Sequence, residues 1–209
     1  MAYCLINKLN FFSNLSEVEK KISKSKIAIV LKNNAYGHGI QEMAKLANEY
    51  NIEHAVVNNI SEANKIHSFF KTTLVLQDIS QKEISENIII TINSLKSIDS
   101  IASGTKVEIK IDTGMHRNGI LPLELDDALN KIIDRGLVLN GVFTHFSSAY
   151  YDDSTIYNQK KLFDELRSKI LFDKRFDYKI RFHCSGSSAL FRFDNSEYDL
   201  ARVGIMSYG

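Results

Sequence analysis

Short apolar runs rich in isoleucine and valine alternate with longer amphipathic stretches along the whole chain. The runs cover residues 26–32, 54–59, 73–77, 88–92, 107–112, 138–146, 178–184 and 199–206. Most are short enough to be strands that are buried on both faces. Strands that alternate with helices imply a parallel sheet with helices outside it.

The stretches between the runs have helical periodicity. One predicted helix face consists of Leu125, Ala128, Leu129, Ile132 and Ile133. Gly136 follows as a C-terminal stop, and Ser154–Leu171 predicts a second amphipathic helix. Ser61 precedes a third, and Ser16 with Glu19 matches a capping box before residues 18–22.

Eight strand runs predict an α/β fold, a (β/α)8 TIM-type barrel that occupies residues 1–209 as one domain. The eighth run lies so close to Gly209 that we expect the barrel to be truncated after its eighth strand, without the last outer helix.

Composition excludes several classes of protein. The net charge of +1 gives no electrostatic footprint for nucleic acid, and no apolar run approaches the roughly 20 residues that span a bilayer. The N-terminus lacks a signal-peptide layout. Cys4 and Cys184 lie far apart and predict buried, reduced thiols. We therefore expect a cytoplasmic protein.

Polar residues gather where the predicted strands end, which is where barrels of this kind carry out chemistry. Lys32 ends the first run, and Asp112 to Arg117 follow the fifth. His145 ends the sixth, residues 183–188 follow the seventh, and residues 202–205 lie at the eighth.

Lys32 leaves a wall of apolar residues. Desolvation favours the neutral amine, and only a neutral amine attacks an aldehyde to form a Schiff base. The alternative is an ordinary strand-end lysine that extends its amine to water.

The end of the chain suggests a phosphate site, since barrels often bind phosphate after strands seven and eight. Ser185, Ser187 and Ser188 offer hydroxyls, and the segment 202–205 offers backbone N–H groups beside Gly204. A serine-rich turn is the plainer interpretation. We expect no metal site, because no carboxylate cluster accompanies His145 and His183.

Three segments resemble one family of enzymes. Residues 29–39 (IVLKNNAYGHG) resemble the cofactor attachment motif of alanine racemases. Residues 110–119 (KIDTGMHRNG) resemble that family's Lys-x-Asp-Thr-Gly-Met-x-Arg-x-Gly segment, and residues 202–209 (RVGIMSYG) its Arg-Pro-Gly-Ile-x-x-Tyr-Gly segment. Order and spacing match over essentially the whole chain.

The resemblance implies a role for each matching residue toward the cofactor, pyridoxal 5'-phosphate. Lys32 would hold it as a Schiff base and act as a catalytic base. The phosphate would bind to Tyr36, Ser187, Gly204 and Ile205. His145 would pack against the pyridine ring, and Arg202 would donate to the pyridine nitrogen. Arg117 and Lys110 would orient the substrate, and Lys110 matches a position that is often carbamylated.

The resemblance also implies the reaction, the interconversion of L-alanine and D-alanine by two bases, which supplies D-alanine for peptidoglycan. Lys32 is one base. The second is a tyrosine from the C-terminal β-domain of the partner subunit in a homodimer, and we expect these 209 residues to lack that domain. We therefore expect the chain alone to be low in activity.

Two departures from the family pattern lie beside the phosphate site: Gly186 replaces a common asparagine and Val203 a usual proline. Two other functions stay open. Length favours a non-catalytic single-domain protein that binds pyridoxal phosphate, whereas the first two motifs favour the racemase. An amino-acid decarboxylase of the same barrel superfamily is a third reading.

Overall fold

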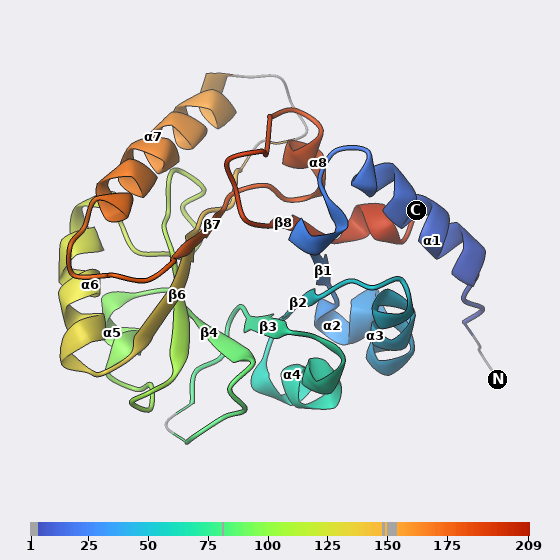
Figure 1. Ribbon diagram of the computed structural model, residues 1–209, viewed down its shortest axis with the longest axis horizontal. Helices are drawn as coiled ribbons and strands as arrows, with labels where there is room; N and C mark the ends of the chain where they lie inside the picture. Colours follow the sequence, from blue (N-terminus) through green and yellow to red (C-terminus); the bar gives the residue numbers. More distant parts are fainter. Residues whose placement is uncertain (1–3, 81, 148, 150–153) are drawn as a thin grey trace.

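The computed structural model describes residues 4–80, 82–147, 149 and 154–209. Within them, eight strands stand in a ring (Figure 1). The strands are β1 (Ile27–Val30), β2 (His54–Val57), β3 (Thr72–Val75), β4 (Ile88–Ile92), β5 (Lys106–Lys110), β6 (Val138–Phe143), β7 (Arg181–His183) and β8 (Ala201–Val203). Each falls within or one residue beside a predicted run, and nearly every strand residue is buried.

All the strand pairs are parallel, and the order β7-β6-β5-β4-β3-β2-β1-β8 places the last strand beside the first. The seam between β7 and β8 is bridged by backbone hydrogen bonds, from Arg202 N to Ser185 O (2.9 Å) and from Asp199 N to Phe182 O (2.8 Å). The predicted (β/α)8 barrel is therefore confirmed.

Helices cover the outside of the ring (Figure 1). They are α1 (Lys8–Glu19), α3 (Ile40–Glu49), α4 (Ile60–Ile66), α5 (Leu95–Ile98), α6 (Leu125–Asp134) and α7 (Ser154–Leu171). Two short turns, α2 (Lys32–Tyr36) and α8 (Ser187–Leu190), follow the carboxyl ends of β1 and β7. The α1 helix packs against the 3-10 turn η4 (Ile205–Ser207), where Asn14 Nδ2 donates to Ser207 O (3.2 Å). The first helix and the last turn of the described chain therefore pack together beside β1 and β8 (Figure 1).

Two predicted helix starts and one predicted burial are wrong. Ser16 lies inside α1, which Asn7 caps nine residues earlier because Phe11, Leu15 and Val18 already form a buried stripe. Asn59, not Ser61, caps α4, its side chain accepting from Glu62 N. Cys4 is exposed because it lies in the extended segment before α1, whereas Cys184 is buried.

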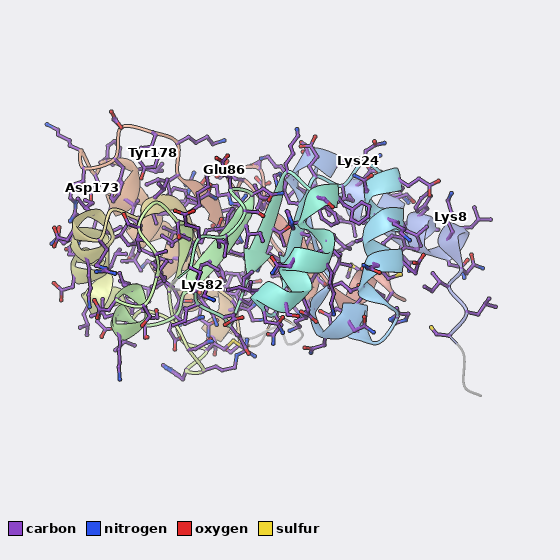
Figure 2. All side chains as sticks on the ribbon, turned by 90° about the horizontal axis from the view of Figure 1, so that it is seen from below. Lys8, Lys24, Lys82, Glu86, Asp173 and Tyr178 are labelled. Atoms are coloured by element: carbon purple, nitrogen blue, oxygen red, sulfur yellow. The ribbon has the colours of Figure 1, made fainter. Side chains whose placement is uncertain are left out.

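The core has two parts. The larger lies between strands and helices, and the smaller lies inside the barrel around Val30, Val56, Leu74 and Phe143. Figure 2 shows charged side chains on the periphery, with Lys8 near one end of the molecule and Asp173 near the other. Among the described helices, none combines the length and the apolar character that a membrane crossing requires.

Candidate active site

A cavity of about 460 Å³ opens at the carboxyl ends of the strands. Its volume lies in the range of small-molecule sites. Every site residue expected from the sequence lines it: Lys32, Tyr36, Lys110, Arg117, His145, Ser187, Arg202, Gly204 and Ile205. The barrel therefore brings together residues that are spread over more than 170 positions of the chain.

The cavity is cationic. Lys32, Lys110, Arg117 and Arg202 line it, and no carboxylate does so among the described residues. Burial, together with the charges of Arg117 and Arg202, lowers the pKa of Lys110 to about 8. Like charges so close together are costly unless an anion joins them, so the site favours an anionic ligand.

The turn after Lys32 has an unusual backbone. Residues 33–36 have φ values of 53–55°, so α2 is a left-handed turn built without glycine. Such residues cost about 1–2 kcal/mol each because Cβ crowds the following carbonyl. Side chains hold the turn: Glu62 accepts from Asn34 N (2.9 Å), and Asn34 Oδ1 accepts from Ile40 N (2.9 Å). The turn places Tyr36 on the same cavity as Lys32.

A cradle of hydroxyl and backbone groups lies at the end of β8. Gly204 N donates to Ser187 Oγ (3.1 Å). A Cβ on Gly204 would lie 2.5 Å from Tyr36 Oη, so only glycine lets this hydroxyl approach so closely. Tyr208 packs edge-on against the Tyr36 ring (5.1 Å) and donates to Val30 O (3.1 Å). The cradle therefore presents the hydroxyls of Tyr36 and Ser187, and the backbone at the start of η4, to a ligand oxygen.

His145 lies two residues beyond β6 rather than at its end, since the pairing with β7 stops at Phe143. Burial and the charge of Arg202 lower the pKa of His145 to about 3. Its imidazole is therefore neutral near pH 7 and can pack against a flat aromatic ring. A Cβ on Gly186 would lie 3.3 Å from His145 Cε1, so the departure at Gly186 leaves room for this ring.

Arg202 is buried and held on both terminal nitrogens. Nη1 donates to His183 Nδ1 in a close contact, and Nη2 donates to Thr144 O (2.6 Å). Burial lowers the pKa of Arg202 to about 10, so the guanidinium stays charged at neutral pH. Its Nε–H has no acceptor within the part of the chain that is described, and the residue lines the cavity.

The loop after β5 shapes the opposite wall. Asp112 Oδ1 accepts from the N–H groups of Gly114 (3.0 Å), Met115 (2.9 Å) and His116 (3.1 Å). Burial would raise the pKa of Asp112, but these three donors hold it below its usual value. The loop carries Arg117 to the cavity, and Asn118 accepts from Lys110 Nζ in a close contact.

Sequence reasoning missed several supporting residues. Glu62, Tyr208 and Asn118 brace groups that were predicted. Tyr208 and Asn118 lie inside motifs that the sequence analysis quoted but were assigned no role, and Glu62 has no local signal that separates it from a surface residue. Glu108 and Arg181 lie inside predicted strand runs, but each run also contains a lysine, so their charge alone does not single them out.

The comparison with protein families identifies the family of the chain. The family model described as "Alanine racemase, N-terminal domain" matches residues 6–209. The chain belongs to this alanine racemase family.

Individual relatives agree. The chain is 40% identical over 212 residues to an alanine racemase of Nitratiruptor sp. and 36% identical over 215 residues to one of Campylobacter curvus, covering 100% of itself and 63% of each relative. A crystal structure of alanine racemase from Bacillus anthracis with bound L-Ala-P matches at a TM-score of 0.82 and 27% identity, over 97% of this chain and 56% of that one. The chain thus spans less than two thirds of the length of these racemases.

Proposed function

We propose that this chain forms the pyridoxal 5'-phosphate-binding barrel of an alanine racemase, which interconverts L-alanine and D-alanine and so supplies D-alanine for peptidoglycan. The observation that carries the proposal is the cavity itself. An anion cradle of Tyr36, Ser187 and Gly204 shares it with a lysine, with a charged arginine that has a spare donor, and with a neutral histidine.

These groups suit the cofactor part by part. Its phosphate would bind to Tyr36 and Ser187 and to the backbone of Gly204 and Ile205, with the Gly204 N–H turning from Ser187 Oγ to the phosphate. Its ring would lie against His145, and its nitrogen would accept from Arg202 Nε–H. Lys32 would hold it covalently. When bound, pyridoxal 5'-phosphate supplies an electron-withdrawing ring next to the α-carbon of the substrate.

Each residue then has a stated duty. The Lys32 amine takes a proton from one face of the substrate and returns it. Arg117 and Lys110 orient the substrate, because their positive charges attract its carboxylate. Arg202 keeps its proton near neutral pH, so it would donate a hydrogen bond to the ring nitrogen without protonating it. Held in this way, the cofactor would be a weaker electron sink, which would favour racemisation over transamination.

The opposite face needs a second base. By the family pattern, it is a tyrosine of a C-terminal β-domain contributed by the partner subunit of a homodimer. We propose that these 209 residues alone hold one of the two bases, and that the protein acts in the cytoplasm.

Proton exchange tests the proposal. The purified chain is incubated with pyridoxal phosphate and D-alanine in deuterated water, and the α-proton signal is followed by NMR. We expect exchange that requires both the cofactor and Lys32, with Lys32→Ala at the rate of free cofactor. Tight cofactor binding without any exchange would instead support the non-catalytic pyridoxal phosphate-binding function.

A further inference from the structure

A second set of polar residues lies inside the barrel, beneath the cavity. Register places Glu108 on β5, Gly141 on β6 and Arg181 on β7 side by side. A Cβ on Gly141 would lie 2.9 Å from Glu108 Oε1 and 2.7 Å from Arg181 Cγ. Glycine at this position therefore makes room for an ion pair in the barrel interior.

Glu108 is fully buried, and both of its oxygens accept hydrogen bonds. Oε1 accepts from Arg181 Nε in a close contact and from Asn140 Nδ2 (3.0 Å). Oε2 faces His183 Nε2 at 2.9 Å. Burial alone would raise the pKa of Glu108, but Arg181 and His183 outweigh it and hold the pKa below the usual value. Glu108 is therefore an anion.

His183 lies between this anion and Arg202. Its Nε2 faces Glu108, and its Nδ1 faces Arg202 Nη1. An ionised carboxylate can only accept hydrogen bonds and a guanidinium can only donate them. His183 must therefore be neutral, with its proton on Nε2 and a lone pair on Nδ1. The opposite tautomer would set N–H against N–H at Arg202.

We propose that Glu108 is a positioning residue that fixes the tautomer of His183 and, through it, aims the free Nε–H of Arg202 into the cavity. Phe143 supports the arrangement, since its ring stacks on His183 (4.8 Å, 10° between planes) and lies under the Arg202 guanidinium (4.9 Å). The role of Arg202 toward the cofactor rests on the proposed function, whereas the tautomer of His183 does not.

Glu108→Gln should disturb this relay whichever way the amide turns. With its NH2 toward His183, it opposes the Nε2–H and drives the proton to Nδ1. With its oxygen toward His183, the NH2 would oppose two donors at once, Arg181 Nε–H and Asn140 Nδ2–H, so the first orientation is favoured and the tautomer should change. Asn140→Ala is the matched control, because it removes a hydrogen bond to Glu108 without changing any group that faces His183.

The test uses the chain without cofactor, labelled with ¹⁵N in the histidine rings, and reads the tautomer from two-bond ¹H–¹⁵N correlations at pH 7. A His183→Phe variant assigns the signals. We expect the Nε2–H form in the wild type and in Asn140→Ala, and the Nδ1–H form or a mixture in Glu108→Gln. A wild-type His183 that is protonated on Nδ1 or doubly protonated overturns the proposal, and so does an unchanged tautomer in Glu108→Gln.

Two further measurements complete the test. If Glu108→Gln does not fold, the ¹³C shift of the Glu108 carboxyl in the wild type decides: it should report a carboxylate at pH 5, and a protonated group there overturns the proposal. If Glu108→Gln folds, its affinity for pyridoxal phosphate should fall about tenfold relative to Asn140→Ala, as expected for one misaimed charge-assisted hydrogen bond. Equal affinities would leave the tautomer result standing and would contradict the role of Arg202 toward the cofactor.

Discussion

Gly204→Ala should weaken cofactor binding through a neighbour rather than at the glycine itself. The added methyl would stand 2.5 Å from Tyr36 Oη, and Cβ atoms essentially never come within 3.0 Å of another heavy atom. Tyr36 lies at the rim, with 38% of its surface exposed, so it can retreat outward. The hydroxyl then leaves the cradle while the fold is preserved.

The magnitude follows from the loss of one hydrogen bond to a phosphate. A charge-assisted hydrogen bond contributes about 1.5–3 kcal/mol, which corresponds to about a 10- to 150-fold loss of affinity. Absorbance titration would compare pyridoxal phosphate with pyridoxal, which lacks the phosphate. We expect a loss for the first and little change for the second.

A double variant isolates the cause. Tyr36→Phe removes the hydroxyl without adding atoms, so adding Gly204→Ala to it should cause little further loss. Additive losses in the double variant would refute the reasoning, and so would an equal loss for pyridoxal.

Three more predictions concern the anchor, the cradle and stability. Borohydride should trap the cofactor on Lys32, as read by peptide mass spectrometry; trapping on another lysine, with Lys32→Ala unaffected, would contradict the assignment. Ser187→Ala should weaken pyridoxal phosphate binding by about tenfold or more, whereas Ser185→Ala should do much less because its hydroxyl is buried and bonded elsewhere; equal effects would move the anion site. Burial lowers the pKa of His54 to about 4, that of His145 to about 3 and that of His183 to about 4. Below about pH 6.5 the unfolded chain therefore binds protons that the native state does not, and the free energy of unfolding should fall as the pH drops toward 4. Urea unfolding at pH 7.5 and 5.5 would measure this fall; in His145→Gln the dependence of the unfolding free energy on pH should correspond to about one proton fewer, and a free energy that does not change with pH would contradict the shifts.

The barrel could be predicted because its strands are buried on both faces, and such strands appear in a sequence as short continuous apolar runs. Strand ends were less accurate. The apolar run 138–146 continues three residues past β6, since the chain stays buried after its pairing with β7 has ended at Phe143.

The supporting residues of the site could not be predicted for two physical reasons. The left-handed turn at residues 33–36 is held by Glu62, a contact between distant segments that local propensity does not encode. Glu108 and Arg181 lie in strand runs that also contain lysines, and their pairing depends on the register across Gly141, which the sequence does not show.

The central claim is that the barrel supplies one catalytic base, Lys32, and lacks the other. The decisive measurement follows deuterium incorporation into D-alanine and formation of L-alanine in one preparation of the 209-residue chain with pyridoxal phosphate. A missing general acid or base costs typically about 10²- to 10⁴-fold. We therefore predict that exchange outpaces inversion by a wide margin. Inversion at the same rate as exchange, at normal enzymatic turnover, would show that a barrel residue serves as the second base and would contradict the account.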